Sequence, residues 1–275
     1  MLDETACRLS YPLDLLNVVS IKENLAEVIT GLSFDLYGSI DSTNTAISQL
    51  AFEEQHAKVC LAEFQTAGRG RHSRQWLAPY ASGLCLSLAW RFKRQVEQIQ
   101  LISLLPAVAL VRVLRRLGIE QVGAKWPNDI ICSGRKLAGI LIEMLPNKLL
   151  QPTIIIGVGL NVYNRSGLVK VPQPITTIED LLVEVPKRNE LAAVLISELV
   201  FLLQQAEQSG LESIRDEWQA YDVFNNKPVC FVEGGNSTRG ISRGINEDGS
   251  LIVETNIGLK SYISGEISLR ADMEE

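Results

Sequence analysis

Apolar residues recur at helical spacing in three parts of the chain. Residues 21–29 carry leucine, isoleucine and valine three or four positions apart, as on one face of a helix. Residues 101–118 and 191–208 are longer and more apolar, and the first of these segments ends at Gly118, a residue type that commonly terminates helices. The pattern therefore predicts a short early helix and two long, buried helices.

Short aliphatic runs between these segments predict β-strands. The runs cover residues 59–64, 84–90, 130–134, 138–144 and 153–162. Several of them are apolar at nearly every position, which is typical of central strands covered on both faces. The sequence therefore predicts an α+β fold in which helices flank a mixed β-sheet.

The pattern changes near residue 225. From there the chain consists of short alternating runs separated by Gly, Asn and Asp turn signals, which predicts a small separate β-barrel or meander over residues 225–270. We expect the boundary within residues 222–228. The predicted organisation is a lead-in segment at 1–30, a larger domain at 31–224 and a small β-domain at 225–275.

Composition narrows the function classes. The chain has 275 residues, 46% of them hydrophobic, and a net charge of −6, which argues against a general nucleic-acid binder and makes any polyanion site local. Five scattered cysteines without a CxxC pair favour a reducing compartment, and with no signal peptide and a longest apolar run too short to span a bilayer, we expect a cytoplasmic protein. Two histidines without nearby ligands argue against a histidine metal site or a Ser-His-Asp triad.

The loop TAGRGRHSRQW, residues 66–76, is strongly basic in this acidic chain. Its glycines can take positive φ angles and turn backbone N–H groups toward an anion, while its arginines suit phosphate or carboxylate oxygens. The residues concerned are Gly68, Gly70, Arg69, Arg71 and Arg74. A solvated basic turn is the other interpretation, and the loop matches neither the P-loop nor the dinucleotide fingerprint.

Four other segments carry candidate chemistry. GVGLNV (157–162) has two glycines that permit close approach of a ligand or backbone, or a bend in the strand. KWPNDI (125–130) presents polar groups on a proline turn, and Lys136 begins an apolar strand where its ammonium group can face a cleft. DSTN (41–44) can cap a helix, bind a neutral polar ligand, or do both.

The order of these motifs resembles the catalytic domain of biotin protein ligases. The matching segments are DSTN, EFQTAGRGRHSRQW, KWPNDI, RKLAGILIE and IIIGVGLNV. GISRGINEDGSL and SGEISLR resemble the end of the bacterial bifunctional members. The resemblance covers nearly the whole chain and implies a catalytic fold like that of class II aminoacyl-tRNA synthetases, followed by an SH3-like barrel.

The resemblance also implies a two-step reaction. The biotin carboxylate attacks the α-phosphate of ATP to give biotinyl-5′-AMP and pyrophosphate, and a lysine of a biotin carboxyl carrier protein, of acetyl-CoA carboxylase or a related carboxylase, then attacks the mixed anhydride. The nucleophile of the first step is already deprotonated, so cations and positioning supply the catalysis. Mg²⁺ is expected, bound mainly through the nucleotide; metal-ligating residues are not assigned.

The resemblance assigns site residues by position. The catalytic set is Arg69, Arg71, Asp129 and Lys136. The biotin set is Ser42, Thr43, Asn44, Gln65, Arg69, Gly70, Arg71, Lys136, Gly139 and Gly157. The ATP and adenylate set is Arg69, Arg71, Trp76, Lys125, Asn128, Lys136 and Asn161, with Trp76 beside the adenine. For Asp129 two roles stay open, holding a magnesium-bound water or orienting the incoming lysine.

One departure bears on DNA. Repressor members of the family carry a winged helix-turn-helix before this region, and residues 1–30 are too few to hold one, so we expect no operator binding unless the sequence is truncated. A homodimer is possible through apolar strands. The alternatives are a lipoate or octanoyl ligase-type relative and a non-catalytic biotin or adenylate sensor.

Overall fold

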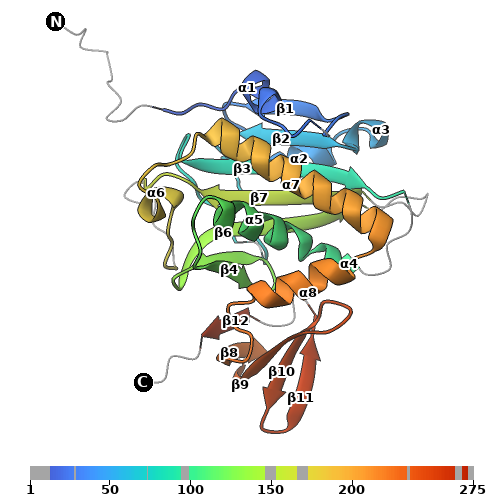
Figure 1. The fold of residues 1–275 in the computed structure, drawn as a ribbon, viewed down its shortest axis with the longest axis vertical. Coiled ribbons are helices and arrows are strands. Elements are labelled where there is room, and N and C mark those ends of the chain that lie inside the picture. The colour runs from blue at the N-terminus through green and yellow to red at the C-terminus, as the bar shows by residue number, and fades with distance from the viewer. Residues whose placement is uncertain are drawn as a thin grey trace, which may run out of the picture.

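The computed structural model describes residues 13–27, 29–72, 74–93, 99–145, 153–165, 173–233, 236–263 and 268–271. These residues form a seven-stranded sheet in the order β1-β2-β3-β7-β6-β5-β4, with helices on its faces, above a five-stranded antiparallel sheet (Figure 1). The strands of the large sheet are β1 (Ser33–Tyr37), β2 (Lys58–Ala62), β3 (Gly83–Arg91), β4 (Val122–Lys125), β5 (Asp129–Cys132), β6 (Arg135–Leu145) and β7 (Thr153–Asn161). Because β1 and β2 are parallel and the other neighbours antiparallel, the predicted mixed sheet is confirmed.

Two of the predicted helices differ in their bounds, and some of the observed helices were not predicted. The helices are α1 (Val18–Glu23), α2 (Thr43–Ser48), α3 (Phe52–Gln55), α4 (Ile99–Ile102), α5 (Leu105–Arg116), α6 (Ile178–Leu181), α7 (Arg188–Ser209) and α8 (Glu212–Tyr221). Of these, α3, α6 and α8 were not predicted. The helix expected at 21–29 begins earlier, because the Asn17 side chain caps it by accepting from the Ser20 N–H, and it ends at Glu23. The helix expected at 101–118 is broken into α4 and α5, since Pro106 belongs in a first turn and not in a helix interior.

The ends of the long helices follow the sequence closely. After α5, Gly118 has φ 91°, and the N–H groups of Gly118 and Ile119 donate to the carbonyls of Arg115 and Leu114, which is a Schellman ending. The helix predicted at 191–208 is confirmed as part of α7. By length and composition α7 could cross a membrane, but more than half of its most apolar window is buried, which is the pattern of a core helix.

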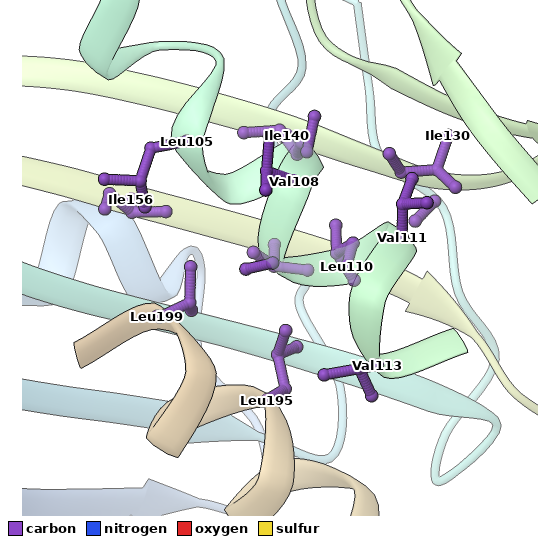
Figure 2. Close-up of a cluster of buried hydrophobic side chains, with 14 of the residues drawn as sticks. Leu105, Val108, Leu110, Val111, Val113, Ile130, Ile140, Ile156, Leu195 and Leu199 are labelled. Carbon is purple, nitrogen blue, oxygen red and sulfur yellow. The ribbon is translucent and has the colours of Figure 1, made fainter. Parts of the chain in front are cut away.

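Helices α5 and α7 cover one face of the large sheet. Helix α5 contacts β4 and β5, and α7 contacts α5 and β3. Figure 2 shows Val108, Leu110 and Leu195 among the side chains that fill this layer. On β3 the residues that join this core alternate with residues that face the other way, as the two-residue period of a strand requires. The hydrophobic core therefore lies on one side of the sheet and leaves the other side for different contacts.

The opposite face carries α2. A small cluster that contains Ile47, Cys60, Ala89 and Ile155 packs there, and α2 contacts β2, β3 and β7. Because these side chains alternate with those of the main core, Ser87 and Gly157, which are paired in the β3–β7 ladder, also face this side.

The C-terminal strands form a second sheet in the order β11-β10-β9-β8-β12. They are β8 (Pro228–Glu233), β9 (Asn236–Ile245), β10 (Leu251–Thr255), β11 (Gly258–Tyr262) and β12 (Ser268–Ala271). The predicted second β-unit is therefore confirmed, and Figure 1 shows α8 between it and the large sheet. Phe231 and Val253 belong to the same buried cluster as α5, and Trp126 Nε1 donates to the Gly249 carbonyl at 3.2 Å, so the two sheets share one core.

The predicted limits of the three segments stay predictions. The change of structure lies between α8, which ends at Tyr221, and β8, which begins at Pro228. Of the lead-in segment, residues 1–12 and 28 lie outside the described part of the chain, as do residues 234–235, 264–267 and 272–275 of the small β-domain.

Candidate functional site

A cavity of about 580 Å³ opens on the face of the large sheet that carries α2. This volume is in the range of small-molecule sites. Of the residues that the sequence singled out, the following line it: Ser42, Thr43, Asn44, Gln65, Arg69, Gly70, Arg71, Trp76, Asn128, Lys136, Gly139, Gly157 and Asn161. Segments that are far apart in the chain therefore meet at one place.

Glycines on β6 and β7 form the floor of the cavity. A Cβ atom at Gly157 would lie 2.4 Å from Asn44 Oδ1, and one at Gly159 would lie 2.2 Å from the Trp76 ring. At Gly139 a Cβ would meet both Trp76 and Lys136 at about 3 Å. The glycines of GVGLNV therefore serve neither to bend the strand nor to let another backbone approach. They leave space for the side chains of Asn44 and Trp76 to lie against the sheet.

The basic loop folds back on itself as a small hairpin. The backbones of Arg69 and Gln75 form an antiparallel β-bridge. The Gly70 N–H donates to the Arg74 carbonyl at 2.7 Å, and the Trp76 N–H donates to the Gly68 carbonyl at 2.9 Å. The expectation of positive φ at the loop glycines is wrong, because the left-handed residue of this loop is His72, with φ 53°. Gly68 is required for space, since its Cβ would lie 2.5 Å from the Trp76 carbonyl oxygen. Residue 73 of the loop lies outside the described part.

Two of the predicted cationic side chains have carboxylate partners. Arg69 Nη2 lies 2.7 Å from Glu143 Oε2, and Lys136 Nζ lies 2.6 Å from Asp129 Oδ1. The Lys136 ammonium group also lies 5.6 Å from the centre of the Trp76 ring. Both pairs are partly exposed, so a ligand can reach their charged groups.

Arg71 is different, because no hydrogen bond or ion pair joins its guanidinium to another residue within the described ranges. Burial lowers the pKa of Arg71, the carboxylate of Asp129 opposes this shift, and the nearby Arg74 adds to it. A partly desolvated cation beside a second cation is stabilised by an anion. The electrostatics of the cavity therefore favour an anionic ligand.

Hydroxyl and amide groups line the other end of the cavity. Ser42 caps α2 by accepting from the Thr45 N–H, so the cap expected from DSTN is confirmed. Gln65 Oε1 accepts from the Thr43 N–H at 2.8 Å, and the Asn44 side chain donates to Glu143 Oε2 at 2.8 Å. This end can exchange hydrogen bonds with an uncharged polar ligand.

The remaining predicted residues have mainly local contacts. Asn128 donates to the Ile140 carbonyl and Asn161 to the Lys136 and Thr176 carbonyls, so both amides also hold the chain around the cavity. Lys125 lies outside the cavity lining, with its Nζ 6.0 Å from the Phe224 ring centre, and Asp129 reaches the cavity through Lys136.

Sequence reasoning assigned no role to Gln75, Leu77, Gln173 or Ile175, which line the cavity, or to two polar strand residues that contact this lining. Glu143 binds both Asn44 and Arg69, and Ser87 contacts Thr43 and Asn44. Both face the cavity side in the strand alternation, and a polar residue in an apolar strand was the available signal.

The sequence and the fold of this chain are similar to those of known proteins. The family model described as "Biotin/lipoate A/B protein ligase family" matches residues 36–161, and the "Biotin protein ligase C terminal domain" matches residues 225–270. The bifunctional ligase/repressor BirA of Escherichia coli is 38% identical over 264 residues, which cover 96% of this chain and 81% of that protein. The chain belongs to the biotin/lipoate A/B protein ligase family. The resemblance inferred from the motifs is thereby confirmed.

Other biotin protein ligases are similar to this chain in sequence and in fold. The biotin–[acetyl-CoA-carboxylase] ligase of Mycobacterium tuberculosis is 31% identical over 254 residues, covering 90% of this chain and 92% of that protein. The solved biotin protein ligase of Aquifex aeolicus in complex with biotin and ATP has a TM-score of 0.75 at 23% identity, over 87% of this chain and 99% of that one, and so supports the fold. The prediction that the chain is an enzyme of the ligase class is confirmed.

Proposed function

We propose that this protein is a biotin protein ligase that activates biotin with ATP and transfers it to a lysine of a biotin carboxyl carrier protein. The observation that carries the proposal is the composition of one cavity. Arginine and lysine side chains for an anion lie beside hydroxyl and amide groups for an uncharged polar ring. The family membership and the match to the biotin-specific C-terminal domain support biotin over lipoate.

In the first step the biotin carboxylate attacks the α-phosphorus of ATP, the bond to the bridging oxygen breaks, and pyrophosphate leaves. No proton moves, so the chain needs no general base. Arg71 and Lys136 lie where they can hold the carboxylate and the α-phosphate, two anions that otherwise repel each other. Asp129 orients the Lys136 ammonium group through their 2.6 Å ion pair, which we propose in place of a role in holding water or the incoming lysine.

In the second step an uncharged lysine amine of the carrier protein attacks the activated biotin carbonyl, AMP leaves with the electron pair of the C–O bond, and the amine nitrogen loses one proton to solvent. Trp76 offers a flat aromatic surface for the adenine, because its ring already lies against the glycine floor at Gly159. The carrier protein of acetyl-CoA carboxylase or a related carboxylase is the proposed acceptor.

Mg²⁺ is proposed as the ion that accompanies the triphosphate. No cluster of three His, Cys, Asp or Glu side chains suited to a metal occurs within the part of the chain that the structure describes. Mg²⁺ commonly keeps several of its water ligands and binds through phosphate oxygens with few protein ligands, which is compatible with these residues. When bound, the ion would neutralise the triphosphate and the leaving pyrophosphate.

Exchange of labelled pyrophosphate into ATP tests the proposal. We expect exchange that depends on biotin and not on lipoate, followed by transfer of labelled biotin to a carrier domain. Exchange with lipoate alone would indicate the lipoate-type relative. Tight binding of biotin without exchange or transfer would indicate a sensor, and either result overturns the proposal.

Three further expectations stay predictions. Sedimentation with and without biotin and ATP tests the homodimer, and a gel shift with operator DNA tests whether the chain binds DNA. Fractionation of cells tests the cytoplasmic location.

A further inference from the structure

Ser87 is a fully buried hydroxyl residue on β3 that the proposed reaction does not use. Its Oγ lies 2.7 Å from Thr43 Oγ1 and 2.5 Å from Asn44 Oδ1. Ser87 does not belong to the lining of the cavity, whereas both of its partners do. A hydroxyl behind a binding site acts on a ligand only through the groups that it touches.

The orientation of the Asn44 amide is determined by its surroundings. Asn44 Nδ2 lies 2.8 Å from Glu143 Oε2 and 3.4 Å from the Leu141 carbonyl oxygen, and both of these oxygens accept hydrogen bonds. Turning the amide over would place its oxygen against a carboxylate and a carbonyl, which is repulsive in a buried setting. The amide nitrogen therefore faces Glu143, and Oδ1 faces Ser87.

That orientation decides how the hydroxyl protons are arranged. Ser87 has one proton, and Asn44 Oδ1 can only accept, so Ser87 donates to Asn44. The 2.7 Å contact between Ser87 and Thr43 then has Thr43 as the donor. The second neighbour of the Thr43 hydroxyl, Gln65 Oε1 at 3.2 Å, is also an acceptor, because it takes the Thr43 N–H. Every protein partner of this hydroxyl within the described residues therefore accepts its proton.

We propose that Ser87 is a positioning residue that, with Asn44 and Glu143, fixes the Thr43 hydroxyl as a hydrogen-bond acceptor toward the cavity. A ligand must then present an N–H group at that place, and an oxygen there faces lone pairs. The inference rests on the proposed function for its ligand, since the cyclic urea of biotin carries two ring N–H groups. It adds a basis for specificity that lies one layer behind the cavity.

Two analogues of biotin test the inference. Each is a cyclic carbamate in which one ring N–H is replaced by a ring oxygen, and the two differ in which N–H is replaced. In one isomer the ring oxygen lies against the Thr43 hydroxyl, which is left without a donor. We expect calorimetry on the wild type to show that this isomer binds about 10- to 100-fold more weakly than biotin, the range for a buried acceptor without a donor. In Ser87→Ala the Thr43 hydroxyl loses its 2.7 Å acceptor and keeps only the longer 3.2 Å contact to Gln65, so its proton can turn to the ring oxygen. We expect the affinity ratio between biotin and that isomer to fall to less than about threefold.

Ser82→Ala is the matched control, because it removes a buried serine hydroxyl beside the start of β3 whose bond goes to the Pro79 carbonyl. It should keep the wild-type ratio for both isomers. If Ser87→Ala does not fold, Ser87→Cys has nearly the same volume and a weak donor, and it should lower the same ratio. An unchanged ratio in the folded Ser87 variant overturns the inference, whereas a wild type that does not bind biotin overturns the proposed function instead.

Discussion

Two groups of charged side chains beside the large sheet have opposite surroundings. Arg188 and Glu63 form a fully buried ion pair at 2.8 Å, and Arg188 also donates to the backbone carbonyls of Gly83 and Asp14. Glu63 accepts the Leu16 N–H with its other oxygen. In the cavity, the Arg71 guanidinium has no such partner among the described residues, and Lys136 has one carboxylate.

The difference separates structural from functional charge. The hydrogen-bonding groups of Arg188 are taken up by the chain itself, which ties the segment before α1 and the start of α7 to β2 and β3. A buried pair of this kind has little capacity left for a ligand. The cavity cations are less fully paired: Lys136 has one carboxylate partner, and the Arg71 guanidinium has none among the described residues, so both have hydrogen-bonding capacity left for an anion.

Removal of the buried cation should have the largest effect. Arg188→Ala leaves Glu63 buried without its counter-charge, and we expect a loss of about 3–5 kcal/mol in the free energy of unfolding. Denaturant unfolding at pH 7 measures it. Arg215→Ala, at an exposed pair with Asp216, is the control and should change stability little. Equal stability of the two variants would show that the buried pair is not the structural element we describe.

Removal of a cavity cation should change catalysis more than stability. Lys136→Ala is expected to slow formation of biotinyl-5′-AMP by about 100-fold, on the order of 3 kcal/mol, by analogy with the loss of one donor to a developing charge. Single-turnover adenylation measures the rate. Lys58→Ala breaks a comparably buried lysine–aspartate pair between β1 and β2, away from the cavity, and should leave the rate unchanged. A normal rate in Lys136→Ala would refute the catalytic role.

The glycine floor offers a steric test of the same cavity. Gly159→Ala places a methyl group 2.2 Å from the Trp76 ring, so the ring must move, at a cost of about 1–3 kcal/mol. We expect calorimetry to show ATP binding weakened about 5- to 150-fold, since about 1.4 kcal/mol corresponds to a factor of ten in affinity. Gly38→Ala meets only the Tyr80 hydroxyl at 3.9 Å and should bind ATP normally. Unaltered binding in Gly159→Ala would remove Trp76 from the nucleotide site.

Asp222 belongs to neither group, and its effect on stability depends on pH. Burial raises its pKa to about 6, against the Phe224 N–H and Lys227, which lower it. The folded protein therefore holds this proton more tightly than the unfolded chain, and stability falls as the pH rises from about 4 through 6. Asp222→Asn should be more stable than the wild type by up to about 3 kcal/mol well above pH 6 and equal to it below pH 4. Urea unfolding at pH 4 and pH 7.5 measures this difference, and a constant difference would contradict it.

Much of the fold could be read from the chain because its signals are local. The period of the apolar residues located α7 and the strands from β2 to β7 except β4, and Gly118 marked the end of α5. The break between α4 and α5 was missed although Pro106 is visible, because the apolar pattern continues across it. The short β1 and the amphipathic but mostly polar α8 were not predicted.

The residues of the site were predicted from the order of the sequence motifs, and their contacts were not predicted. The motifs named most of the residues that line the cavity, whereas Glu143 and Ser87 were missed, since a single polar residue within an apolar strand does not indicate its contacts. The partner of Lys136 was also unknown, because Asp129 lies on the neighbouring strand β5 and the pairing depends on the register of β5 and β6.

The sequence by itself determined the helix and strand periods, the local charge of the loop and the family to which the chain belongs. Only the tertiary structure decided which polar groups meet. Strand register sets which residues share a face, and the glycines at 157 and 159 let Asn44 and Trp76 approach the sheet. A hydrogen bond depends on the distance and direction between two atoms, and for residues far apart in the chain the fold alone sets both.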